Sequence, residues 1–211
     1  MFQRIISTID RNLPFLVPFF LALLLFPPGS RGITPPATES SPSKQDPSTL
    51  EPEEGFHQAS TFRILIDKTS RTLMLFKGNS LMALYPIALG SQPYGDKKRV
   101  RDGRTPQGTF YICRINPRST FRWSFLLSYP NAEDARRGLQ NGSIDKDMAQ
   151  LIVQATRNRE VPPQETSLGG GIQIHGGGTN SDWTQGSISL SDEHVEQLSR
   201  FVRVGTPVQI R

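Results

Sequence analysis

Several residue types that build common functional sites are scarce in this chain of 211 residues. It has one cysteine, Cys113, so it can form no intrachain disulfide and no cysteine-rich zinc site or iron–sulfur cluster. Only three histidines are present, and neither an HExxH pair nor a GKS or GKT phosphate loop occurs. The sequence therefore implies no metal and no cofactor, which argues against zinc-dependent hydrolases and nucleotide-driven enzymes.

Glycine and proline are frequent but not dominant. The 18 Gly and 17 Pro amount to about a sixth of the chain, below the roughly 25–30% that is typical of disordered proteins. Seven of the prolines lie in residues 27–59, among many Ser and Thr. Because this stretch lacks the apolar periodicity that would offset the entropy of ordering it, we expect a disordered linker.

An unbroken apolar run, residues 13–26, follows Arg4 and Arg11. It is shorter than the about 20 residues that span a bilayer comfortably and fits the apolar part of an export signal. We expect residues 1–26 to be a signal peptide or an N-terminal membrane anchor, followed by the linker 27–59 and a folded domain 60–211.

The folded domain is predicted to be mainly β with a few helices. Phe62, Ile64 and Ile66 alternate with polar residues, the period of a half-buried strand. Further strands are expected at 72–76, 80–89, 109–115, 121–127, 171–175, 187–190 and 207–211. Helices are expected at 145–157, with Met148, Leu151, Ile152 and Ala155 inward, at 191–202, and near 131–139.

Positive charge gathers in the folded domain, whose net charge is +7, whereas residues 1–59 carry −2. Five cations lie between Lys97 and Arg104. They form either a solvated loop or a patch that attracts a polyanion. Few aromatic residues stand beside them to stack bases, so we expect no nucleic acid, and an anionic envelope polymer or membrane surface fits better.

Two glycine-punctuated segments carry most of the chemical information. One is DGRTPQGTF at residues 102–110; the other is IQIHG at 172–176, followed by DWTQGSISLS at 182–191. In both, a strand delivers a polar residue to a glycine turn, where backbone N–H groups are free to face a ligand.

With the Tyr-Pro-x-x-x-Gly strand end at residues 85–90 and the Val-Gly-Thr-Pro-Val strand at 204–208, these motifs stand in the order of a known family. Over residues 61–211 the sequence resembles the L,D-transpeptidase catalytic domains of peptidoglycan enzymes. The resemblance implies a β-sandwich-like catalytic fold, an exported protein of the periplasm or cell envelope, and peptidoglycan stem peptides as partners.

The resemblance also implies roles for particular residues. His175 would be the acid/base partner, and Ser187 stands where the family has its nucleophilic Cys. Backbone N–H groups around Gly176, Gly186 and Ser187 would form the oxyanion hole and its turn. The substrate groove is expected to include Arg104, Trp183 and Thr184, although Arg104 could face solvent and Trp183 could cap the core.

Serine at position 187 leaves the activity open. A thiol of pKa about 8.5 is partly ionised at neutral pH, whereas a serine hydroxyl depends on its base throughout the attack. Mid-strand Cys113 is expected to be a small buried hydrophobe, not a replacement. The chain is thus a cell-envelope enzyme that transfers or hydrolyses stem-peptide bonds, a catalytically inactive peptidoglycan-binding descendant or, more remotely, a basic adaptor.

Overall fold

The computed structural model describes residues 61–211, so the predictions for residues 1–59 lie outside the described part of the chain. In chain order the elements are β1 (Phe62–Asp67), β2 (Thr72–Lys77), β3 (Ser80–Pro86), β4 (Gly108–Ser119), β5 (Arg122–Leu127), α1 (Ala132–Gln140), α2 (Lys146–Asn158), β6 (Gln173–His175), β7 (Ile188–Ser189), α3 (Asp192–Ser199) and β8 (Pro207–Ile210). The prediction of a mainly β domain with a few helices is confirmed.

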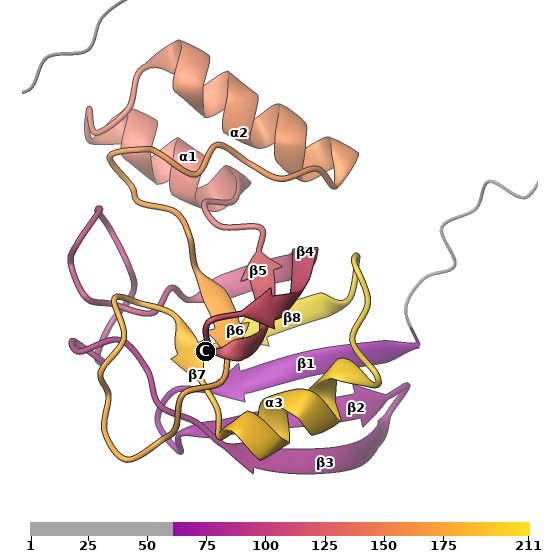
Figure 1. Cartoon of the computed structure of the whole chain (residues 1–211). Coiled ribbons are helices and arrows are strands. Elements are labelled where there is room, and N and C mark those ends of the chain that lie inside the picture. The colour runs from indigo at the N-terminus through magenta and orange to yellow at the C-terminus, as the bar shows by residue number, and fades with distance from the viewer. Residues whose placement is uncertain (1–60) are drawn as a thin grey trace, which may run out of the picture. The chain divides into compact units, whose positions relative to one another are not determined.

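The strands form one sheet in the order β3-β2-β1-β8-β4-β5-β6-β7 (Figure 1). β8, the last strand of the chain, lies between β1 and β4, parallel to the first and antiparallel to the second. The C-terminal residues therefore join the β1–β3 meander to the β4–β7 half. On the far side, β5 pairs with β6, and β6 pairs in parallel with β7.

The main core lies under this sheet and is covered by α3. Alternate strand residues such as Ile64, Ile66 and Ile174 are fully buried. α3 begins at an N-cap, Ser191, whose side chain accepts a hydrogen bond from the backbone N of His194. Val195 and Leu198 of α3 are buried, as expected, but the helix ends at Ser199, three residues before the predicted end.

A second, smaller core lies between α1 and α2, which Figure 1 shows side by side and apart from α3. The predicted inward stripe of α2 is partly wrong: Leu151 is 53% exposed, and Ala149 is buried instead. This core includes two small residues, Ala135 of α1 and Ala149 of α2, together with Leu168 from the segment after α2. At Gly138 of α1, an added Cβ would lie 2.9 Å from the side chain of Leu168.

No helix among residues 61–211 is long and apolar enough to cross a bilayer. The apolar run at 13–26 lies outside the described residues.

Candidate active site

Strands β6 and β7 bring two of the predicted site residues to one face of the sheet. Ile174 pairs with Ile188 and His175 with Ser189, and both isoleucines are fully buried on the core side. Because side chains alternate along a strand, His175 and Ser187 share the opposite face, offset by two residues. Ser187 is held there by its Oγ, which accepts a hydrogen bond of 3.1 Å from the backbone N of Gln173.

His175 is 5% exposed, and its Nδ1 lies 2.6 Å from the carbonyl oxygen of Gly176. A carbonyl only accepts, so this contact assigns the proton to Nδ1 and leaves the lone pair on Nε2. Burial lowers the pKa of the imidazole from its usual value. The ring is therefore neutral near pH 7 and carries one basic nitrogen.

Two aromatic rings enclose the imidazole. Phe121 stacks on His175 with ring centroids 4.8 Å apart, and Trp183 meets it edge-on at 5.7 Å. Phe121 comes from the turn between β4 and β5, and its carbonyl oxygen accepts a hydrogen bond from the backbone N of Gly176. Trp183 therefore lies beside the predicted catalytic histidine, with 39% of its surface exposed.

The turn before Ser187 is fixed by Thr184. The buried Thr184 Oγ1 donates to the Ser187 carbonyl oxygen at 2.7 Å and accepts from the Gly186 N at 3.1 Å. The backbone amides of Gly176 and Gly186 thus already have acceptors. An oxyanion that used the Gly186 amide would compete with the threonine hydroxyl.

Asp182 anchors the loop that carries this turn, and the motif comparison alone did not single it out. Its carboxylate pairs with the guanidinium of Arg71 at 2.8 Å and accepts a hydrogen bond of 2.8 Å from the backbone N of Leu89. The side-chain hydrogen bond to Asp182 raises the pKa of Arg71. The loop is thereby tied to the start of β2 and to the segment after β3.

Arg104 lies near the site only through its backbone. A Cβ added at Gly186 would come within 2.6 Å of the Arg104 carbonyl oxygen, whereas the guanidinium points to the carbonyl oxygen of Asp96, at 3.5 Å. The structure therefore does not bring the Arg104 side chain to His175. No hydrogen bond joins Arg104 to Ser187 within the described residues.

A polar groove of about 450 Å³ lies over β4, β5 and β6, on the sheet face that carries His175. Ser124, which lines it, is the cross-strand partner of His175, and Gln173, also in its wall, holds Ser187. Arg114 and Arg118 supply positive charge at its other side. We call this cavity the sheet-face groove. No sequence motif predicted this groove; the signal that could have indicated it is the alternation of Arg114, Asn116 and Arg118 with Ile115 and Pro117.

Cys113 is not part of this arrangement. Its Sγ lies 3.4 Å from the carbonyl oxygen of Leu126 on β5, and burial raises the pKa of the thiol to about 11. The side chain is therefore a protonated thiol at neutral pH. It is half-buried, not fully buried as its mid-strand position predicted. Among residues 61–211, no group of three or more His, Cys, Asp and Glu residues lies close enough to hold a metal ion.

Comparison with known proteins gives one family and several solved structures. Residues 61–210 match the model of the YkuD family, the L,D-transpeptidase catalytic domain. No curated protein matches the sequence significantly.

Among solved structures, a point mutant of the helical cell shape determining protein Pgp2 from Campylobacter jejuni aligns with a TM-score of 0.51 and 22% identity, covering 74% of this chain and 49% of that one. Bd1075 from Bdellovibrio bacteriovorus aligns with a TM-score of 0.48 and 22% identity, over 72% and 48%. An L,D-transpeptidase from Mycobacterium smegmatis aligns at 0.43 and 12%, over 72% and 58%. The chain thus spans about half the length of the first two, and the likeness to Pgp2 is one of fold.

Proposed function

The chain belongs to the L,D-transpeptidase catalytic-domain family, and from this membership we propose that it acts on the stem peptides of peptidoglycan in the cell envelope. The family supports a peptidoglycan-related role, and the site supplies the finer proposal. Its main support is that a neutral His175, Ser187 and the sheet-face groove share one face of the sheet.

The reaction we propose is acyl transfer from the amide between the L-centre of diaminopimelate and the terminal D-Ala. The Ser187 hydroxyl attacks the amide carbon while Nε2 of His175 accepts its proton, so an Oγ–C bond forms. When the C–N bond breaks, the imidazolium returns the proton to the leaving D-Ala amine. An amine or a water molecule then attacks the ester, which gives a cross-link or a trimmed peptide.

The sheet-face groove would receive the substrate in this scheme. Stem peptides carry carboxylates, and the guanidinium groups of Arg114 and Arg118 are suited to bind them. Phe121 and Trp183 shield His175 from water, which favours the neutral imidazole and leaves Nε2 free to accept a proton.

One observation favours a second candidate, binding of stem peptides without turnover. No hydrogen bond links Ser187 to His175 in the described part of the chain, and the serine Oγ instead accepts one from Gln173 N. A serine nucleophile needs contact with its base, because its hydroxyl does not ionise near neutral pH. A retained groove beside a serine that lies apart from its base would suit a binding module.

Product analysis of the full chain with tetrapeptide muropeptides tests both candidates. The wild type is compared by mass spectrometry with Ser187→Ala and Ser187→Cys. Release of D-Ala by the wild type, abolished in Ser187→Ala, supports acyl transfer through Ser187. Turnover by Ser187→Cys alone supports the binding module.

Stem-peptide binding is measured separately from turnover. Arg114→Gln combined with Arg118→Gln is expected to weaken binding of the tetrapeptide at least tenfold, because two carboxylate contacts are lost. The matched control, Lys77→Gln with Arg200→Gln, removes two exposed cations away from the groove. Equal effects of the two pairs would contradict the assignment of the groove.

A further inference from the structure

A second hollow, of about 520 Å³, lies in the loop between β3 and β4, and four cations line it. Lys98, Arg99 and Arg101 are exposed, and Arg104 is half-buried. The remaining lining residues are Gln92 and Asp102. Within residues 61–211, none of the four cations forms an ion pair with a carboxylate. We call this hollow the basic pocket.

Asp102 does not neutralise the basic pocket, because its carboxylate is already engaged. Its Oδ1 lies 2.8 Å from the ammonium of Lys97, a buried side chain, and its Oδ2 accepts hydrogen bonds from the backbone N atoms of Lys98 and Arg99. The fifth cation of the sequence cluster, Lys97, is therefore an internal partner of Asp102. The four lining cations keep their full positive charge.

The loop is also held in place from three sides. Lys68 donates to the carbonyl oxygens of Gly95 and Thr105. Arg137 of α1 pairs with Asp96 at 2.8 Å and donates to the Lys97 carbonyl oxygen at 3.4 Å.

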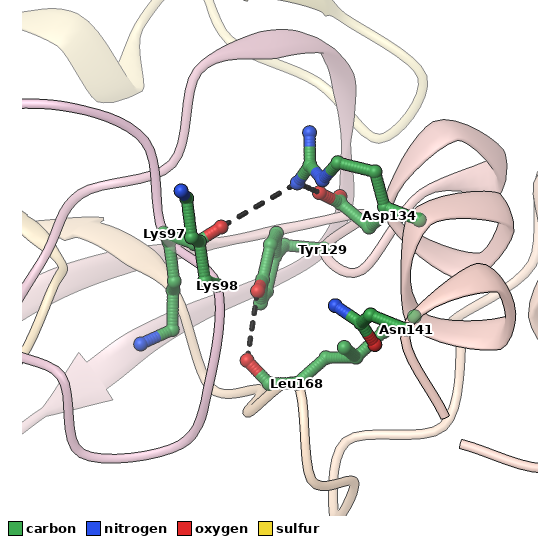
Figure 2. Close-up of a pocket in the computed structure, with 8 residues that line it drawn as sticks. Lys97, Lys98, Tyr129, Asp134, Asn141 and Leu168 are labelled. Carbon is green, nitrogen blue, oxygen red and sulfur yellow. Dashed lines mark hydrogen bonds and ion pairs between the residues drawn. The ribbon is translucent and has the colours of Figure 1, made fainter. Parts of the chain in front are cut away.

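The third attachment comes from the segment after α2. The backbone N of Val100 donates to the carbonyl oxygen of Ser167 at 2.8 Å. The Tyr129 hydroxyl donates to the Leu168 carbonyl oxygen at 2.8 Å, and both residues line a separate, smaller pocket with Lys97 and Lys98 (Figure 2). Because the loop backbone is fixed in this way, a ligand does not have to order it, and only the cationic side chains lose freedom on binding.

The chemistry of the lining indicates the ligand. Arginine guanidinium groups form two parallel hydrogen bonds with phosphate oxygens, and lysine adds a point charge. The lining contains no aromatic or aliphatic side chain that would stack a base or hold an acyl chain. We propose that the basic pocket binds a phosphate group, separately from the sheet-face groove.

The test is an NMR titration of the full chain with inorganic phosphate at constant ionic strength. It is paired with cosedimentation on vesicles of phosphatidylglycerol in phosphatidylcholine and of phosphatidylcholine alone. The test variant combines Lys98→Gln, Arg99→Gln and Arg101→Gln. The matched control combines Lys77→Gln, Lys146→Gln and Arg157→Gln, which removes the same charge from exposed positions elsewhere.

We expect saturable shifts of the amides of residues 97–104 with phosphate, at least tenfold weaker in the test variant and unchanged in the control. A loss of phosphatidylglycerol binding in the test variant alone, without a phosphate response, supports the pocket and identifies lipid headgroups as the source. A phosphate response without vesicle binding supports a soluble source. Equal losses in both variants, or no binding to either probe, overturn the proposal.

Discussion

Replacement of Gly186 by alanine should disrupt the turn before Ser187 more than an equivalent change elsewhere in the same loop. Gly186 has a φ of +123°, and an added Cβ would lie 2.6 Å from the carbonyl oxygen of Arg104 and 3.1 Å from Cδ1 of Ile172. The oxygen belongs to the backbone, so a rotamer change cannot relieve the contact. One of the two segments must move.

The expected decrease in the free energy of unfolding has two contributions, which a matched control variant separates. The left-handed backbone alone costs a residue with a side chain about 1–3 kcal/mol, and overpacking adds about 1–3 kcal/mol. Gly178 has a φ of +98° and nothing within 4 Å of an added Cβ, so Gly178→Ala carries only the first part. Gly186→Ala should therefore destabilise the domain by about 2–6 kcal/mol, given both contributions.

Thermal unfolding followed by circular dichroism measures the difference. At about 2–4 °C per kcal/mol for a domain of this size, Gly186→Ala should unfold several degrees below Gly178→Ala. If the two variants unfold at the same temperature, the Arg104 carbonyl does not confine the turn. The packing argument for this part of the site would then be wrong.

Three further predictions concern the site and its supports. Because burial lowers the pKa of His175, the unfolded chain binds a proton that the folded chain does not, so the free energy of unfolding should fall as pH drops below about 6.5. In urea titrations the His175→Gln variant should show a shallower fall, and the same dependence of unfolding free energy on pH in both proteins would contradict the pKa shift. Asp182→Asn breaks the ion pair with Arg71 and should lower the free energy of unfolding, measured in urea, by about 1–3 kcal/mol. The control Asp145→Asn keeps a helix-capping acceptor and should lower it little. Similar decreases in both variants would contradict the anchoring role of Asp182. With a thiol pKa of about 11, Cys113 should react with iodoacetamide at pH 8 far more slowly than free cysteine. Mass spectrometry follows the labelling, and a rate like that of free cysteine would contradict the raised pKa.

The strands and the family were predictable because their signals are local. Alternation at Phe62, Ile64 and Ile66 specifies a strand with one buried face, whatever its partner. The glycine turns after His175 and before Ser187 are likewise short motifs, which can be recognised without knowledge of the rest of the chain. The length of α3 was less predictable, because Val202 is buried just as a helical residue would be.

Contacts between distant segments were not predictable in the same way. The ion pair of Arg71 with Asp182 joins residues that are 111 positions apart, and no sequence pattern around either residue predicts it. The inward face of α2 depends on what packs against it, and the small residues Ala135 of α1 and Ala149 of α2 belong to the core between these helices. Period alone placed Leu151 inside, whereas the close helix contact selects Ala149 and leaves Leu151 in solvent.

The charge cluster at 97–104 shows why residue type alone cannot decide a function. Five cations in eight residues predict either a solvated loop or a patch that attracts a polyanion, but neither description fits Lys97. Lys97 is buried against Asp102, whereas Lys98, Arg99 and Arg101 remain exposed. The single aspartate in the segment organises the loop instead of neutralising it, because its oxygens bond to Lys97 and to backbone amides. The charge pattern predicts a positive electrostatic potential around the loop. Which cations can bind an anion depends on which of them already pair with carboxylates in the folded domain.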